Sequence, residues 1–133
     1  MTVPVALTIA GSDSSGGAGI QADLKTFAAL GVYGASVITA LTAQNTQGIA
    51  AIHHVPAHFV TAQIDAVFGD LDVGALKIGM VAHAAVIDAI AAGLSRWTPA
   101  RVVLDPVMVA TSGAHLLESD AIEALRSKLV PRV

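Results

Sequence analysis

The sequence contains no cysteine, and this absence excludes several kinds of site at once. Without cysteine the chain has no disulfide framework, no thiolate ligand for a metal ion and no cysteine nucleophile. A protein without disulfides is compatible with the reducing cytoplasm, which is where we predict that this protein resides.

Basic and aromatic residues are also scarce. The chain has seven Lys and Arg against ten Asp and Glu, a formal net charge of -3, and only one Trp, one Tyr and three Phe. A nucleic-acid surface needs a concentrated basic patch, and a base-stacking platform needs exposed aromatic rings. We therefore predict no nucleic-acid partner.

Long hydrophobic runs are missing as well. The longest candidate, residues 80–94, is interrupted by His83 and Asp88, whereas a membrane-spanning helix needs roughly 18 to 20 apolar residues. The apolar N-terminus has no basic segment, so a buried strand explains it better than a signal peptide does. We therefore predict no membrane partner.

The chain does contain a regular alternation of strand-like and helix-like segments. We predict main strands over 3–10, 35–43, 75–78 and 101–104, with a short strand over 49–55 outside the main sheet. Helical spacing of apolar residues predicts helices over 16–30, 56–68, 84–94 and 118–129. Alternation of this kind implies right-handed crossovers and a mainly parallel sheet covered on both faces, which is an α/β fold.

Four segments that follow the predicted strands are rich in Gly, Ser, Thr and Asp. They span residues 11–19, 42–48, 79–82 and 105–113. In open parallel sheets, ligands bind beyond the carboxyl ends of the strands. We predict a binding site where these four segments meet.

The first of these segments is glycine-rich and leads into a helix. Backbone amides at a helix N-terminus attract acceptor atoms or anions, and we expect Gly17 and Gly19 to be needed for positive φ or close approach. On the helix, Asp23 is spaced with Ile20 and Phe27 beside the apolar stripe. Periodicity alone favours an edge position that reaches solvent, although a carboxylate there should be paired or hydrogen-bonded.

Gln44 and Asp105 are the other polar candidates. The carboxamide of Gln44 can both donate and accept hydrogen bonds, so it can recognise the edge of a heteroaromatic ring. Asp105 follows a strand and could hold a magnesium-bound water or a phosphate network. Residues 111–113, Thr-Ser-Gly, could offer hydroxyls and an amide to a phosphate.

Taken in order, four blocks of the sequence resemble the signature of the hydroxymethylpyrimidine/phosphomethylpyrimidine kinases of thiamin biosynthesis. The blocks are TIAGSDSSGGAGIQADLKT at 8–26, TALTAQNT at 39–46, KIGM at 77–80, and DPVMV at 105–109 with Ser112-Gly113. The resemblance extends over essentially the whole chain, and its first block is highly specific.

The resemblance implies a ribokinase-like three-layer α/β/α fold and a kinase that uses ATP and Mg²⁺. Such kinases phosphorylate 4-amino-5-hydroxymethyl-2-methylpyrimidine and then its monophosphate, and we expect a homodimer for the full-length protein. By match to the family, Gln44 hydrogen-bonds the aminopyrimidine and Asp23 helps to shape the pocket. Asp105 lies on the phosphate and magnesium side, without being assigned as a direct metal ligand, and the remaining lining residues are Gly11, Ala18, Met80 and Val107.

The chain departs from the family in length. Family members continue well past the point where the sequence stops, so residues 1–133 correspond to the N-terminal part of one kinase domain. The resemblance implies that the ATP-binding residues, a glycine-rich anion hole and the catalytic base, a cysteine or an aspartate, lie outside these residues. We therefore predict no catalytic residue within them, and no turnover by them alone.

Two alternatives remain open. A pyridoxal kinase of the same superfamily also phosphorylates a hydroxymethyl heteroaromatic compound, although the Gly16–Gly19 block and Gln44 favour the pyrimidine. A non-catalytic pyrimidine-binding module is the other alternative, because the predicted pocket lies within these residues and the predicted catalytic machinery does not.

Overall fold

The centre of the fold is a parallel sheet of four strands. A computed structural model describes residues 2–107 and 119–133. The strands are β1 (Val5–Ala10), β2 (Tyr33–Ile38), β5 (Ala75–Ile78) and β6 (Val102–Leu104), in the spatial order β2-β1-β5-β6. Every neighbouring pair runs parallel, so the predicted α/β fold with a mainly parallel sheet is confirmed.

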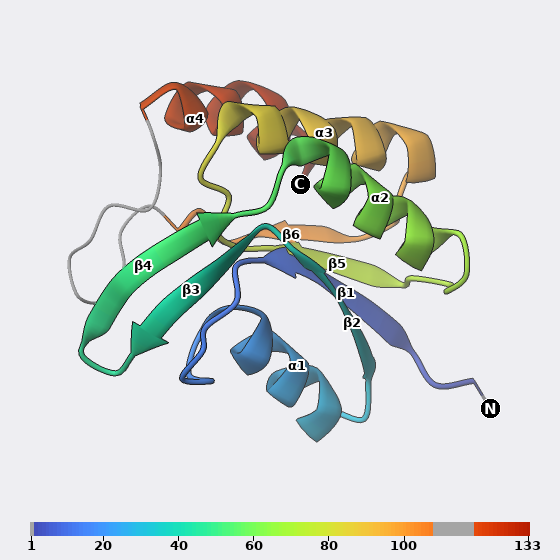
Figure 1. Cartoon of the computed structure of the whole chain (residues 1–133). Coiled ribbons are helices and arrows are strands. Elements are labelled where there is room, and N and C mark those ends of the chain that lie inside the picture. The colour runs from blue at the N-terminus through green and yellow to red at the C-terminus, as the bar shows by residue number, and fades with distance from the viewer. Residues whose placement is uncertain (1, 108–118) are drawn as a thin grey trace.

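Helices cover both faces of this sheet, as Figure 1 shows. Helix α1 (Gly19–Ala29) lies on one face, and α2 (Ala57–Phe68), α3 (Ala84–Trp97) and α4 (Ser119–Ala124) lie on the other. The chain continues from α4 into the single turns η1 (Leu125–Leu129) and η2 (Val130–Arg132). Within the described ranges, no helix combines the length and apolar character needed to cross a membrane.

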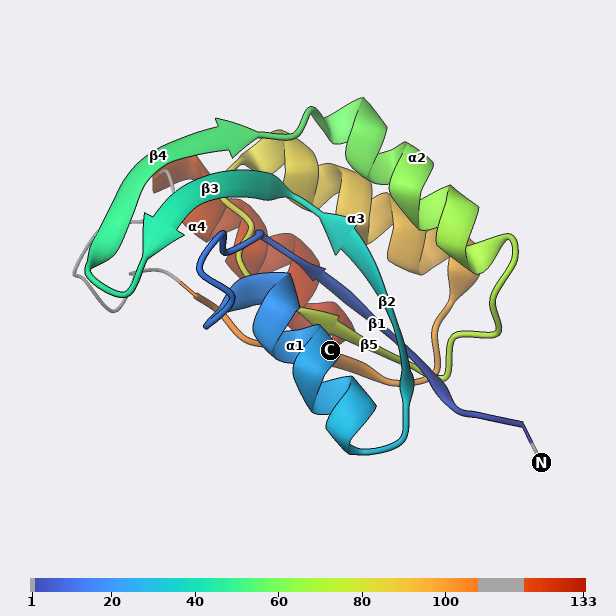
Figure 2. The same ribbon diagram turned by 60° about the horizontal axis from the view of Figure 1, so that its bottom comes forward.

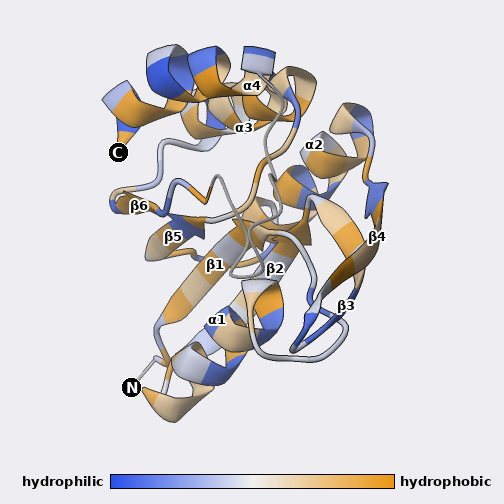
Figure 3. Ribbon diagram, turned by 90° about the vertical axis from the view of Figure 1, so that its left-hand side faces the viewer, coloured by the Kyte–Doolittle hydropathy of each residue, from blue (hydrophilic) through white to orange (hydrophobic). Residues whose placement is uncertain are grey.

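The core lies between the sheet and the layer of α2, α3 and α4. Leu7 of β1, Ile78 of β5 and Ile87 of α3 are completely buried there. Burying each such side chain contributes about 1.5 to 3 kcal/mol. Figure 3 shows apolar residues concentrated in the strands and hydrophilic residues on the outer surfaces of α1 and α4. The sheet is thus a rigid platform that carries the loops at its carboxyl edge.

The predicted strand over 35–43 was wrong as one element, because the chain forms two strands there. β2 ends at Ile38, and β3 (Ala40–Asn45) leaves the parallel sheet to pair antiparallel with β4 (Gly48–His54). Thr39 makes the break: its amide donates to Ala10 O at 2.9 Å, and its hydroxyl donates to Met80 O at 2.8 Å. Both strands are rich in β-forming residues, so hydropathy alone shows no boundary.

The β3–β4 hairpin curves away from the sheet, as Figure 2 shows. Its second strand confirms the prediction of a short strand outside the main sheet over 49–55. Consequently Gln44 does not follow the end of a parallel strand, as predicted, but lies with Thr42 within the antiparallel strand β3. The hairpin brings them to the same edge by folding over it.

Candidate functional site

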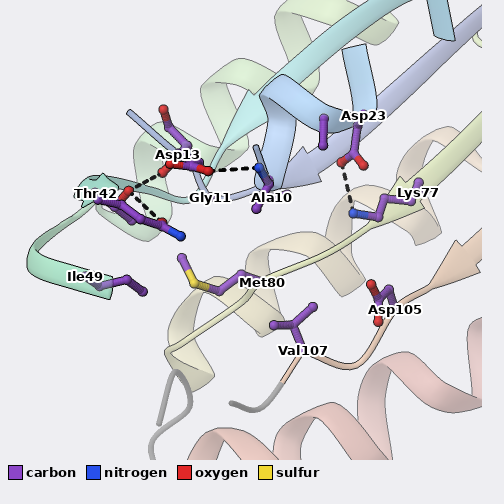
Figure 4. Close-up of a pocket in the computed structure, with 15 residues that line it drawn as sticks. Ala10, Gly11, Asp13, Asp23, Thr42, Ile49, Lys77, Met80, Asp105 and Val107 are labelled. Atoms are coloured by element: carbon purple, nitrogen blue, oxygen red, sulfur yellow. Dashed lines mark hydrogen bonds and ion pairs between the residues drawn. The ribbon is translucent and has the colours of Figure 1, made fainter. Parts of the chain in front are cut away.

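A pocket of about 320 Å³ lies at the carboxyl ends of β1, β5 and β6, beside the hairpin (Figure 4). The pocket is lined by residues of the glycine-rich loop, the start of α1, the hairpin, and the segments after β5 and β6. All seven residues predicted for the site line this one pocket: Gly11, Ala18, Asp23, Gln44, Met80, Asp105 and Val107. The roles assigned to them individually remain predictions.

One side of the pocket is apolar. Met80 and Val107 pack with Ile49 of the hairpin and the buried Ala40 in a small cluster separate from the main core. A Cβ atom at Gly11 would collide with the Met80 methyl group, so glycine there leaves room for the thioether. Apolar walls with a few placed polar groups are the usual lining of a site for a small organic molecule.

The glycine-rich loop is organised by Asp13, a residue that the sequence analysis did not single out. One carboxylate oxygen, Oδ1, accepts from the Ser15 amide at 2.8 Å and from the Ser15 hydroxyl at 2.7 Å. The other, Oδ2, accepts from the amides of Gly17 at 2.9 Å and Ala18 at 2.8 Å. The anion that these amides bind is therefore a side chain of the loop itself.

Asp13 is only 4% exposed. Burial is the largest single influence on its carboxyl group and raises the pKa, but the hydrogen bonds from Ser15, Gly17 and Ala18 together outweigh it. The pKa of Asp13 consequently lies below its ordinary value. A local signal was available, since an Asp in a loop often accepts from the backbone amide two residues later in an Asx turn.

The backbone requirement for glycine falls partly on other positions than predicted. Gly16 and Gly19 have φ of 83° and 58°, whereas Gly17 has no positive φ. A Cβ atom at Gly19 would collide with the carbonyl oxygen of Gly11, while one at Gly17 would meet Asp13 Oδ2 at an ordinary 3.7 Å. Gly19 therefore has the expected positive φ and close contact, whereas Gly17 has no positive φ, and its close approach to a ligand stays a prediction.

Hydrogen bonds fasten the glycine-rich loop to the hairpin. The Ser14 hydroxyl donates to Gln44 O at 2.6 Å and accepts from Gln44 N at 2.7 Å. The Thr42 hydroxyl donates to Ser12 O at 2.6 Å, and Ser12 N donates to Ala40 O at 2.8 Å. The backbone of Gln44 is thereby held in place by the loop on the opposite side of the pocket entrance.

Asp23 is paired rather than solvent-directed, so the edge interpretation from periodicity was wrong and the expectation of a partner is confirmed. Its Oδ2 accepts from the hydroxyl of the fully buried Thr8 at 2.6 Å and lies 2.9 Å from Lys77 Nζ. Side chains of Asp23 and Lys77 are 18% and 25% exposed. Sequence reasoning missed Lys77 and Thr8, because partners from β1 and β5 meet α1 only in the fold.

Asp105 stands directly after β6, where its amide donates to Ile78 O at 2.9 Å. Figure 4 shows Lys77 between Asp23 and Asp105. In the part of the chain that the structure describes, no three His, Cys, Asp or Glu gather as metal ligands. The phosphate-binding prediction for Thr111, Ser112 and Gly113 lies outside the described residues.

Solved structures that are similar to this chain include a phosphomethylpyrimidine kinase and pyridoxal kinases. A crystal structure of phosphomethylpyrimidine kinase from Clostridium difficile 630 matches 98% of this chain and 56% of its own, with a TM-score of 0.92 and 52% identity. Pyridoxal kinase from Staphylococcus aureus in complex with AMP-PCP and pyridoxal matches 100% of this chain and 47% of its own, with a TM-score of 0.84 and 30% identity. The fold thus defines the class: the chain has the predicted ribokinase-like fold that these kinases share.

Sequence comparison places the chain within that class. The family model described as phosphomethylpyrimidine kinase matches residues 13–133. The hydroxymethylpyrimidine/phosphomethylpyrimidine kinase of Rhizobium meliloti (strain 1021) is 66% identical over 127 residues, covering 96% of this chain and 47% of that protein. Its Escherichia coli (strain K12) counterpart is 56% identical over 128 residues, with 96% and 48% covered. The chain belongs to the phosphomethylpyrimidine kinase family, and it spans about half the length of these curated relatives.

Proposed function

We propose that the protein transfers the γ-phosphoryl group of ATP to 4-amino-5-hydroxymethyl-2-methylpyrimidine, and then phosphorylates the resulting monophosphate. The observation that carries this proposal is the union of Gln44, Asp23 and an apolar wall in one pocket at the carboxyl edge of the sheet. A relative named for this activity is 66% identical to the chain over 127 residues. An ADP-release assay with the purified full-length protein, ATP, Mg²⁺ and the pyrimidine tests the proposal directly.

Each wall of the pocket has a proposed task. Met80 and Val107 contact the faces of the pyrimidine ring, and the Gln44 carboxamide forms a hydrogen bond with the polar edge of that ring. Asp23, held by Lys77 and Thr8, shapes the end of the pocket towards the sheet. The chain thereby fixes the position of the hydroxymethyl oxygen. Positioning of this kind contributes much of the rate in phosphoryl transfer, where the protein does little covalent chemistry itself.

In the first reaction, the hydroxymethyl oxygen forms a bond to the γ-phosphorus of ATP while the bond from that phosphorus to the β,γ-bridging oxygen breaks. The hydroxyl proton passes to a base, and ADP leaves. The described residues that line the pocket include Asp13, Asp23 and Asp105, but Asp13 and Asp23 are engaged with donors. We propose that the base is not among these 133 residues.

Asp105 is the residue proposed to face magnesium. Mg²⁺ in kinases is typically held by one or two carboxylates, by phosphate oxygens and by water, so a single carboxylate at the pocket edge fits such a site. When bound, the ion neutralises charge that develops on the phosphates. Asp105 contributes an acceptor at the end of β6, and the hydrogen bond from its backbone amide to Ile78 O fixes the backbone there.

Replacing Gln44 with alanine tests the pyrimidine-binding role. Gln44→Ala is expected to weaken pyrimidine affinity by about 1 to 3 kcal/mol, because the ligand loses a partly buried hydrogen-bonding partner. Isothermal titration calorimetry measures the change. Gln47→Ala is the matched control, since Gln47 lies on the same hairpin, is exposed and does not line the pocket. Equal affinities for both variants would reject the role of Gln44.

Residues 1–133 expressed alone are expected to release no ADP at ordinary kinase rates. The pocket within them provides the acceptor side and Asp105, while general-base help alone is typically worth about 10²- to 10⁴-fold in rate. The measurement is ADP release at saturating pyrimidine and ATP. Pyrimidine-dependent turnover at about 1 s⁻¹ or faster, the normal range for kinases, would show that the base lies within these residues.

Pyridoxal is the second candidate substrate, because structures of pyridoxal kinases share the fold at 30% and 36% identity. The same ADP assay with pyridoxal in place of the pyrimidine separates the two. Binding of the pyrimidine without turnover by the full-length protein would favour a non-catalytic module.

We further propose that the full-length protein is a homodimer in the cytoplasm. Sedimentation measurements test the dimer, and cell fractionation tests the location.

A further inference from the structure

The side chain of Gln44 faces Thr42, two residues earlier on β3. Gln44 Oε1 lies 3.1 Å from the Thr42 hydroxyl oxygen, and Ser12 O lies 2.6 Å from the same hydroxyl oxygen. Figure 4 marks both contacts of Thr42. The β-bulge between Ala43 and Gln44 and the two hydrogen bonds to Ser14 hold the Gln44 backbone in place.

The Thr42 hydroxyl has a single proton, and the shorter contact requires it. Two oxygens 2.6 Å apart are within the usual O–H···O range of 2.5 to 3.0 Å and would repel each other without a proton between them. Ser12 O is a carbonyl and can only accept, so Thr42 must donate to it. Towards Gln44, the Thr42 oxygen then has only lone pairs to offer.

A lone pair needs a donor opposite it, and the carboxamide has one. The oxygen and nitrogen ends of a carboxamide have nearly the same shape, so the hydrogen-bonding network decides which end faces a given neighbour. A separation of 3.1 Å suits N–H···O and lies beyond the usual O–H···O range. With Nε2 donating to Thr42, each of the two contacts in the chain Gln44–Thr42–Ser12 joins one donor to one acceptor.

We infer that Thr42 is a positioning residue that turns the Gln44 carboxamide so that Oε1 faces the pocket and accepts a hydrogen bond from the ligand. The inference rests on the proposed function and deepens it. The site then selects a heteroaromatic ligand that presents an N–H donor, such as an exocyclic amino group, and disfavours a ring that presents a carbonyl oxygen at the same position.

The test compares two ligands, 4-amino-5-hydroxymethyl-2-methylpyrimidine and its 4-oxo analogue, in which the amino group is replaced by an oxygen. Calorimetric dissociation constants are measured for the wild-type protein, Thr42→Ser and Thr42→Val. Wild type is expected to bind the amino ligand about 10- to 100-fold more tightly, since the oxo ligand sets two acceptors against each other. Thr42→Ser keeps the hydroxyl and should keep this ratio.

Thr42→Val removes the hydroxyl, so the carboxamide can turn to suit either ligand. The amino-to-oxo ratio is expected to fall by about tenfold, whatever the loss in affinity for each ligand. Equal weakening of both ligands, with the ratio unchanged, overturns the positioning role and leaves Thr42 a purely structural residue.

The comparison of the two ligands on the wild-type protein does not require any variant to fold. Preference of the wild-type protein for the oxo ligand overturns the inferred orientation and leaves the proposed pyrimidine site standing. Failure of wild type to bind either ligand overturns the proposed function and the inference with it. The outcomes for the two proposals are therefore distinct.

Discussion

Gly19→Ala is expected to destabilise the protein by about 3 kcal/mol or more and to weaken pyrimidine binding. Gly19 has φ of 58°, a conformation that strains a residue with a side chain by about 1 to 3 kcal/mol. The added Cβ would also collide with the Gly11 carbonyl oxygen, and backbone cannot yield as a flexible side chain does. Urea unfolding measures the stability, and calorimetry measures the affinity.

Two matched glycine substitutions separate strain from collision. Gly31 has φ of 75°, and a Cβ atom added there would have nothing within 4 Å, so Gly31→Ala should show the strain alone, about 1 kcal/mol or slightly more. Gly17→Ala should cost little, because φ is not positive and the nearest atom is 3.7 Å away. Gly31 does not line the pocket, so its variant should bind normally. A Gly19→Ala variant no less stable than Gly31→Ala would contradict the collision.

Asp13→Ala is expected to cost about 2 to 3 kcal/mol of stability and to loosen the pocket. The carboxylate accepts four hydrogen bonds within the glycine-rich loop, and bonds to a charged acceptor are individually worth about 1.5 to 3 kcal/mol. Ser15, Gly17 and Ala18 are exposed, so water can accept hydrogen bonds from their donors after the substitution. This replacement limits the loss of stability. Pyrimidine affinity should fall with stability, because Asp13, Ala18 and Gly19 line the pocket.

The pH dependence identifies the carboxylate as the cause. The pKa of Asp13 is lower in the folded protein than its ordinary value, so its stabilising contribution is present above the unfolded pKa and is lost as pH falls through the folded pKa. The difference in free energy of unfolding between wild type and Asp13→Ala should be constant near pH 7 and shrink below about pH 4. A difference that persists unchanged at pH 2 would assign the effect to packing instead.

The parallel sheet and its helices were predictable because their signals are local. The apolar run of β1 and the 3.6-residue spacing along α2 each indicate their own element without reference to the rest of the chain. The loops after β1, β5 and β6 could be placed together for a general reason: parallel strands end at one edge. The hairpin was not predictable in this way, because a strand that changes sheets keeps the same composition before and after the change.

The sequence by itself determined the α/β order of elements, the three loops at the carboxyl edge and, through the resemblance of its first block, the family. Only the tertiary structure decided how the polar groups pair. Asp23 is 15 residues from Thr8 and 54 residues from Lys77 along the chain, and no periodicity relates them. Ser14 reaches Gln44, and Thr42 reaches Ser12, only because the hairpin folds over the loop. Hydropathy patterns report which face of an element is buried, whereas hydrogen-bond partners depend on distances between elements that only packing sets.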